Sequence, residues 1–352
     1  MMKKFFAWGN DLHSGRTSIP FVGRTKLWLT IAGALVIASM IVPLVSGFNF
    51  GIAFTGGSEF HVANTSETDE SVGTEAITAV VPGAEPNVVP TSDTALRITT
   101  NQLSDAEMQE VREALVSAYG VDNEDVTSTF VGPTWGQDVT EKMLRALVIF
   151  VAIAMVVMAL YFRTWKMSLA AIVGLFVVMI VTMGIYATLG FEVTPEAMIG
   201  FLTVLSFALY DTVVVFDKIR ENTEDFESNR RMKFSELVNL GINQTTVRSI
   251  NTSVISVLPI GAILFIGVAL LGAGTLTDIS LSLFVGTIVA ALSTLFVASP
   301  FYAWLRSREE AVREQEELVE ETRERLGLPD RAPVLFEDLD EARSERAATT
   351  GS

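Results

Sequence analysis

The stretch FALYDTVVVFDKIREN, residues 207–222, begins like a membrane-spanning helix and then places a carboxylate inside it. Asp211 follows an uncharged run that starts at Ala197, and only five uncharged residues separate it from Asp217. A charged side chain at the centre of a bilayer costs about 2.5–3.5 kcal/mol even on translocon-based scales. The reason for such a residue depends on how the rest of the chain crosses the membrane.

Charged residues are segregated along this chain. It has 352 residues, of which 49% are hydrophobic, yet its net charge is −16. Five further stretches carry no charge: residues 27–58, 146–162, 167–191, 249–277 and 279–305. Because a bilayer crossing needs about 20 apolar residues, we expect six spans, at residues 27–48, 143–162, 167–189, 197–217, 244–271 and 279–305. The first follows a polar and basic start without a cleavage site, so it is not interpreted as a signal peptide.

Basic residues predict the orientation, since they favour cytoplasmic loops. They occur before the first span and after the second, fourth and sixth, whereas residues 190–196 and 272–278 carry no Lys or Arg. Lys142 and Arg145 oppose this assignment but are outnumbered. We therefore expect a protein of the cell membrane with both termini cytoplasmic. The cytoplasmic parts would be residues 1–26, the loop 218–243 and the charged tail 306–352.

Residues 49–140 would then form one domain outside the cell. FNFGIAFTGGSEFHV (48–62) resembles a strand interrupted by glycines, and residues 75–81 a short helix. Residues 87–90 and 95–100 predict two strands, Ser104 and Glu107 form a capping-box signature for a helix to about Tyr119, and DVTSTFVG (125–132) predicts a last strand. The order βαββαβ predicts an α+β ferredoxin-like domain. The expected fold class is thus an all-α six-helix transmembrane bundle with this extracytoplasmic domain.

The charged residues after the last span predict a solvated helix followed by disorder. Glu309/Arg313, Arg313/Glu317 and Glu321/Arg325 are four residues apart, which favours a helix. Past Pro333 we expect a disordered tail. The acidic, lysine-poor surface suggests a salt-loving microbe, because salt screens the repulsion between like charges; an acidic variant of an ordinary protein is the alternative.

No catalytic motif is present, so we expect a protein that is not an enzyme and needs no cofactor or metal. Cysteine is absent, and His13 and His61 are isolated. Phe54, Thr55, Gly56 and Gly57 could form a phosphate-binding loop, but no helix or lysine follows them. A glycine pair in a strand more often marks a bulge or a close backbone approach, and we favour that interpretation.

Two ionisable residues are placed where they are costly. Asp211 lies about 9 Å along the helix axis from Asp217, at about 1.5 Å per residue, and Arg248 immediately precedes the uncharged run of the fifth span. The two could pair across neighbouring helices. A structural ion pair, or a snorkelling arginine, is the alternative to an ion-coupling pair. Polar side chains that could form a relay surround Arg248 in sequence: Asn243, Gln244, Thr245, Thr252 and Ser253.

These residues resemble the SecF branch of the SecD/SecF family of protein-export membrane subunits. The similar motifs are YDTVVVFDKIREN (210–222), FTGG (54–57) and QTTVR (244–248) followed by Thr252 and Ser253. The resemblance covers about residues 25–305, and it implies that Asp211 and Arg248 are the ion-coupling residues. Two positions depart from the family pattern: Ala53 replaces the usual acid before the FTGG motif, and Ser249 replaces the usual threonine. The surface composition suggests a halophilic archaeal member.

The resemblance implies an auxiliary subunit of the Sec translocase that uses the transmembrane ion gradient to assist export of unfolded proteins. Its expected partners are SecD, the Sec translocon channel, unfolded exported proteins and the lipid bilayer, and no nucleic acid is expected. A non-conducting scaffold that stabilises the translocon is the alternative. A lipid or drug exporter of the wider superfamily would usually carry two six-helix halves.

Overall fold

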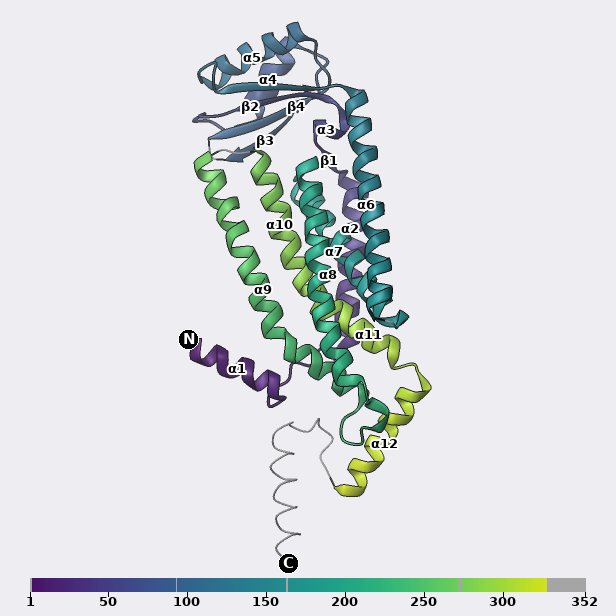
Figure 1. Ribbon diagram of the computed structural model, residues 1–352. Helices are drawn as coiled ribbons and strands as arrows, with labels where there is room; N and C mark the ends of the chain where they lie inside the picture. The colour runs from purple at the N-terminus through teal and green to yellow at the C-terminus, as the bar shows by residue number, and fades with distance from the viewer. Residues whose placement is uncertain (1, 93, 163, 272–273, 328–352) are drawn as a thin grey trace, which may run out of the picture.

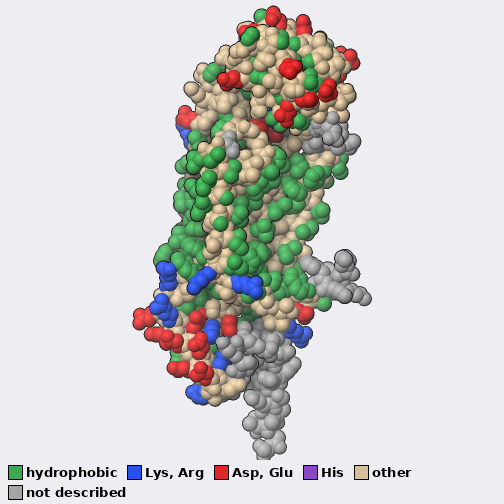
Figure 2. Space-filling model, turned by 180° about the vertical axis from the view of Figure 1, so that it is seen from behind, with side chains coloured by type: hydrophobic (Ala, Val, Ile, Leu, Met, Phe, Trp, Pro, Cys, Tyr) green, Lys and Arg blue, Asp and Glu red, His purple; other side chains and the backbone are tan. Residues whose placement is uncertain are grey.

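The computed structural model describes residues 2–92, 94–162, 164–271 and 274–327; the tail predicted to be disordered lies outside these residues. A long helical bundle carries a sheet-containing domain at one end and a smaller group of helices at the other (Figure 1). Six helices are long and apolar enough to cross a membrane, at Thr25–Val45, Pro133–Phe162, Trp165–Leu189, Pro195–Ser228, Phe234–Ile266 and Leu276–Arg306. The predicted number of spans is therefore found within the described residues, and apolar side chains cover the face of the bundle that Figure 2 shows.

The bundle helices are longer than the hydropathy of the sequence predicts. They are α2 (Thr25–Ser46), α6 (Pro133–Phe162), α7 (Trp165–Leu189), α8 (Pro195–Thr223), α9 (Phe234–Leu271) and a sixth made of α10 (Gly274–Ser293), the π-helical η2 (Thr294–Ala298) and α11 (Ser299–Arg306). Helix α6 begins ten residues before the predicted span. The predicted loop 218–243 is largely helical, with only residues 224–233, including η1 (Phe226–Ser228), between α8 and α9. Glu, Lys and Arg are good helix formers, so a helix continues where the apolar signal stops.

Three helices form the centre of the bundle. Half of the apolar window of α7, of α8 and of the sixth span is buried, against 6% for α2. Small residues let these central helices approach closely. A Cβ added to Gly200 of α8 would lie 1.8 Å from Ser282 Oγ of α10, and one added to Gly286 would lie 2.6 Å from Val204 Cγ2. Larger residues at these positions would force α8 and α10 apart.

The sheet domain, residues 57–131, has the predicted element order. Its elements are β2 (Gly57–Val62), α4 (Glu70–Val80), β3 (Asn87–Ser92), β4 (Ala95–Thr100), α5 (Asp105–Tyr119) and β5 (Val126–Val131). The strands pair in the order β3-β4-β2-β5, all antiparallel. Both helices lie on the face of the sheet that points away from the bundle (Figure 1). The predicted capping box of α5 is confirmed, because Ser104 and Glu107 bond to each other's backbone N–H.

The predicted strand over residues 48–62 is wrong in its first half. Only Asn49–Phe50 (β1) is extended there; it pairs in parallel with β6 (Glu192–Val193), and a one-turn helix, α3 (Ile52–Thr55), follows. Gly56 has φ +74° and Gly57 has φ +138°, so the chain changes direction between α3 and β2. Short apolar runs do not separate strand from helix by periodicity alone.

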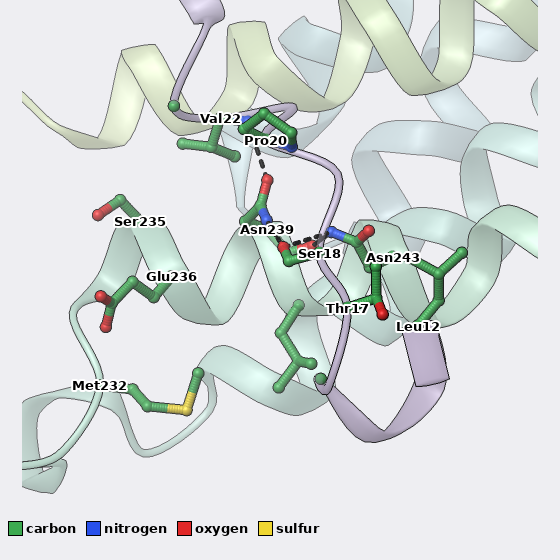
Figure 3. Close-up of a pocket in the computed structure, with 13 residues that line it drawn as sticks. Leu12, Thr17, Ser18, Pro20, Val22, Met232, Ser235, Glu236, Asn239 and Asn243 are labelled. Carbon is green, nitrogen blue, oxygen red and sulfur yellow. Dashed lines mark hydrogen bonds between the residues drawn. The ribbon is translucent and has the colours of Figure 1, made fainter. Parts of the chain in front are cut away.

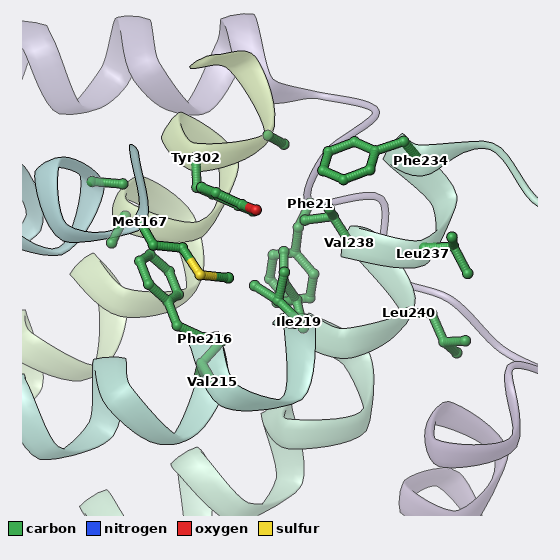
Figure 4. Close-up of a cluster of buried hydrophobic side chains, with 14 of the residues drawn as sticks. Phe21, Met167, Val215, Phe216, Ile219, Phe234, Leu237, Val238, Leu240 and Tyr302 are labelled. Carbon is green, nitrogen blue, oxygen red and sulfur yellow. The ribbon is translucent and has the colours of Figure 1, made fainter. Parts of the chain in front are cut away.

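A large apolar cluster joins the bundle to the helices at the end opposite the sheet domain (Figure 4). Phe216 of α8, Phe234 of α9 and Tyr302 of α11 pack there with Phe21, which precedes α2. Ring centroids of Phe216 and Tyr302 lie 5.7 Å apart. This cluster fixes the N-terminal segment, which follows helix α1 (Met2–Ser14), against the membrane helices.

The tail helix α12 (Glu310–Leu326) is helical as predicted, but one of its faces is buried. Arg323, only 4% exposed, donates to both carboxylate oxygens of Glu236 in α9 at 3.0 and 2.6 Å. Gln315 accepts from the backbone N–H of Phe234 at 3.0 Å. The helix is therefore docked on the start of α9.

Replacing Glu236 tests this docking. Glu236→Ala removes both carboxylate contacts of Arg323, and breaking a buried ion pair costs about 3–5 kcal/mol. We expect trypsin to release α12 from the purified variant at least about tenfold faster than from the unmodified protein. Glu317→Ala, at an exposed position of α12, should leave the release rate unchanged; equal rates for both variants would contradict the docking.

Candidate functional site

Asp211 is buried in the middle of α8, with 4% of its surface exposed. Its Oδ1 accepts a hydrogen bond from the Ser249 hydroxyl of α9. Its Oδ2 is buried and has no hydrogen-bond partner among the residues that the structure describes. A carboxylate with one unsatisfied buried oxygen is costly, and this makes Asp211 the candidate functional residue of the bundle.

A local irregularity of the sixth span lies beside Asp211. The next residue of α8, Thr212, bonds through its hydroxyl to the Thr294 hydroxyl at 3.2 Å. Thr294 begins the π-helical turn η2 between α10 and α11, and the Ser299 hydroxyl donates to its carbonyl at 2.8 Å. Single π-helical turns inside α-helices often occur at functional sites. The acid therefore lies where the backbone of a neighbouring helix has an alternative hydrogen-bonding register.

The expected pair of Asp211 and Arg248 is not formed in this structure. Arg248 is exposed on α9, one residue before Ser249, and forms no ion pair with any residue in the described ranges. Successive residues of a helix point about 100° apart, so only one of Arg248 and Ser249 can face Asp211. The serine faces inwards, and the arginine faces the outside of the bundle.

The five candidate relay residues do not converge on the acid. Asn243 is buried and accepts from Ile19 N–H at 2.8 Å. Its amide also donates to Ser18 Oγ at 3.3 Å (Figure 3), so these bonds tie the N-terminal segment to α9. Gln244 accepts from Asn222 at 2.9 Å. Thr245 bonds to its own helix at Gly241, Thr252 to the Arg248 carbonyl, and the buried Ser253 hydroxyl has no partner among described residues. None of these hydrogen bonds reaches the side chain of Asp211 or Arg248.

Polar residues continue the exposed surface around Arg248. Thr203, Ser206 and Tyr210 of α8 and Asn251 of α9 are exposed at the level of the spans. The hydroxyls of Thr203 and Ser206 bond to carbonyls of their own helix, at 2.9 and 3.3 Å. An exposed arginine, amide and phenol on two membrane helices are unusual side chains to present to lipid.

The FTGG motif makes close backbone approaches, as favoured from the sequence. A Cβ on Gly57 would lie 2.5 Å from the Thr100 carbonyl, and one on Gly56 would lie 3.0 Å from Pro133 Cα. A Cβ added to Gly136 of α6 would lie 2.6 Å from the Phe54 carbonyl oxygen. Phe54 is half-buried, and Thr55 is exposed and bonds to Gly56 O at 3.0 Å. The motif thus packs α3 against the start of α6.

A second polar cluster lies where the sheet domain meets the bundle. Arg97 of β4 contacts Glu192 Oε2 at 2.8 Å and Asp278 Oδ2 of α10 at 3.5 Å, with side-chain exposures of 11–15% for all three. A cavity of about 240 Å³ is lined by these residues together with Ala53, Glu59, His61 and Glu196. His61, expected to be an isolated surface residue, is half-buried there. One arginine therefore connects the sheet to two separate parts of the bundle.

Sequence reasoning missed Ser249 as a contact of Asp211 and all of the Arg97 cluster. The sequence position of Ser249 could have indicated its role, because Ser249 directly follows Arg248 of the fifth-span motif. Glu192 and Asp278 are 95 and 181 residues from Arg97 in the sequence, so only the folded chain brings them together.

Burial raises the pKa of Glu59 on β2, although the Arg97 guanidinium counteracts this, while Glu192, Asp278 and Glu196 add to it. A carboxyl whose pKa is raised on folding stabilises the fold fully below its unfolded pKa, and this stabilisation is lost as the pH rises through the folded pKa. We therefore expect Glu59→Gln to raise the thermal midpoint at pH 7. The gain should vanish at about pH 3.5, below the usual pKa of about 4.3 for glutamate. Equal gains in thermal midpoint at both pH values would contradict the raised pKa of Glu59 as their cause.

Comparisons with known proteins identify the family. A family model described as "Protein export membrane protein SecD/SecF, C-terminal" matches residues 111–308. The protein translocase subunit SecF of Streptomyces coelicolor is 39% identical over 88% of this chain and 82% of its own length. The subunit of the same description from Mycobacterium leprae is 36% identical over 89% and 69%.

A solved structure is similar along most of the chain. The crystal structure of SecDF, a translocon-associated membrane protein from Thermus thermophilus, superposes with a TM-score of 0.72 at 27% identity. It covers 83% of this chain, which spans only 39% of that longer protein. The comparisons do not test the expected halophilic archaeal source, which stays a prediction. The motifs, the six spans and these likenesses agree, and the chain belongs to the SecF subunits of the SecD/SecF family of protein export membrane proteins.

Proposed function

We propose that this SecF subunit associates with a SecD partner and the Sec translocon and uses a transmembrane ion gradient to assist export of unfolded proteins, without catalysing a covalent reaction. The observation that carries the proposal is the burial of Asp211 in a membrane span with one unsatisfied carboxylate oxygen. Ionisation of such a group is costly in hydrocarbon. A proton or small cation that neutralises it therefore favours a different helix arrangement from the one that the free carboxylate favours.

The surroundings of Asp211 support a role in which the helices around it move relative to one another. Its carboxylate accepts a hydrogen bond from the neutral Ser249 hydroxyl, and the adjacent π-helical turn can shift its backbone register. A purely structural acid in hydrocarbon would be expected to have a counter-charge. In the proposal, a change of charge on Asp211 shifts α8 relative to α9 and the sixth span, and the sheet domain follows through the Arg97 contacts.

The exposed polar surface supports a partner subunit. Arg248, Asn251 and Tyr210 face outwards from α8 and α9 in the single chain. A second six-helix subunit that packs there would cover the arginine and could supply its counter-charge. The names of the Streptomyces and Thermus relatives, a translocase subunit and a translocon-associated protein, point to SecD and the translocon as these partners. In this proposal, Arg248 takes part in ion coupling at the contact with the partner subunit. Arg248 does not pair with Asp211 in this structure.

Replacing the acid tests the coupling role. Asp211→Asn keeps the shape and can still accept from Ser249, but it removes the charge change. We expect normal abundance and partner binding, with protein export as slow as in a deletion strain. Asp217→Asn, an exposed acid on the same helix, should export normally. Export is measured as the rate at which a secreted precursor is processed.

Two outcomes would contradict the coupling role. Normal export with Asp211→Asn would exclude it, and the non-conducting scaffold would then be favoured. Loss of export that follows only from degradation of the variant would assign a structural role. Arg248 is exposed, so the loss of the Asp211 charge leaves no unpaired arginine inside the bundle. The abundance of the variant protein therefore separates a coupling role from a structural role.

The proposed orientation places both termini in the cytoplasm and the sheet domain, which we infer to be ferredoxin-like, outside. Reporter fusions at residues 100, 193 and 275 should be active outside, and those at residues 165, 230 and 320 inside. Six spans require alternation of these signals along the chain. An outside signal at residue 230 would contradict the orientation and the assignment of the charged helices α1 and α12 to the cytoplasm.

A further inference from the structure

A groove lies at the end of the bundle opposite the sheet domain, where α2 enters the membrane. Its cavity is about 600 Å³, and its walls come from the start of α2, the start of α9, and α11 with the neighbouring α12. The residues that line it are Val22, Gly23, Arg24, Thr25, Lys26, Leu27, Phe234, Ser235, Ala303, Trp304, Ser307 and Glu316. The groove is therefore at the boundary between the apolar band and the charged end of the molecule (Figure 2).

The charge in and around the groove is positive, although the whole chain is strongly acidic. Arg24 and Lys26 line it, and neither forms an ion pair within the described part of the chain. The guanidinium of Arg308 lies 4.0 Å above the ring of Trp304. Glu316 is the one acid among the lining residues, and its Oε1 accepts from the Ser235 backbone N–H at 3.0 Å. Two cations and one engaged carboxylate therefore line the groove, and a third cation lies over its Trp304 ring.

An apolar stripe begins at the groove and runs up α2. Leu27, Ile31 and Leu35 are four residues apart, so they share one face of the helix, and they are 49%, 43% and 51% exposed. Only 6% of the apolar window of α2 is buried inside the molecule. Trp304, with an apolar ring and a polar N–H, lies beside the cations, as is common at the level of lipid headgroups. An anion bound in the groove would have hydrocarbon directly above it.

We propose that this groove binds the phosphate headgroup of an anionic phospholipid, with Arg24 and Lys26 as its charge contacts and the acyl chains along Leu27, Ile31 and Leu35. Basic pockets between membrane helices bind such headgroups, and each basic residue near the surface adds to the attraction. A free phosphate ion would use the cations but not the stripe. A neutral phospholipid would use the stripe but gain little from two unpaired cations.

Native mass spectrometry of the full chain in non-ionic detergent tests the proposal, with phosphatidylglycerol or phosphatidylcholine as the added lipid. We expect the unmodified protein to retain phosphatidylglycerol in preference to phosphatidylcholine. Arg24→Gln combined with Lys26→Gln should reduce that preference at least about tenfold, which corresponds to about 1.4 kcal/mol. Lys142→Gln with Arg145→Gln removes the same charge near the other end of the bundle and should keep the preference.

Four results would overturn the proposal. Equal retention of both lipids by the unmodified protein would exclude charge recognition. Displacement of phosphatidylglycerol by millimolar inorganic phosphate would show a soluble-anion site instead. A matching loss in the Lys142→Gln/Arg145→Gln protein would show a general effect of net charge. Arg24→Lys with Lys26→Arg, which keeps both charges, must retain the preference; if it also loses lipid, the segment has been disrupted and charge recognition is rejected.

Discussion

No backbone N–H or C=O can remain unpaired in hydrocarbon, and this constraint determines the architecture of the chain. Each spanning segment satisfies its backbone as a helix, so six apolar runs become six helices. Lipid tails are as apolar as leucine, and helices therefore associate through close packing. The glycine positions at which α8 meets α10, Gly200 and Gly286, allow that packing. In the π-helical turn the Thr294 carbonyl accepts from both the backbone N–H and the hydroxyl of Ser299.

Several buried polar side chains bond to a carbonyl of their own helix, as Thr245 does with Gly241 and Thr246 with Ile242, which leaves the neighbouring helices free to pack. Asp211 differs, because its bond from Ser249 crosses to another helix and its second oxygen has no partner among the described residues. In the proposed function, the charge of this group affects the spacing of α8 and α9.

The sheet domain is attached to the bundle by two contacts of different physical character. The close approach of α3 to α6 is short-range packing, in which Gly136 leaves room for the Phe54 carbonyl. The Arg97 contacts to Glu192 and Asp278 are electrostatic and only partly exposed. Packing holds one edge of the domain at a fixed distance, whereas ion pairs can exchange partners. In the proposed function, a motion of α10 would reach the sheet through Asp278 and Arg97.

The sequence by itself determined the six spans, the βαββαβ order and the capping box at Ser104, because hydropathy, strand alternation and caps are local properties. It also placed Asp211 within a span. Tertiary structure alone decided that Ser249 rather than Arg248 faces Asp211, since the rotation of α9 about its axis is fixed by packing against α1, α8 and α10. It likewise decided the helical turn at Ile52–Thr55 and the meeting of Arg97 with Asp278 across 181 residues. Such contacts depend on how whole helices are oriented, and no local pattern in the sequence carries that information.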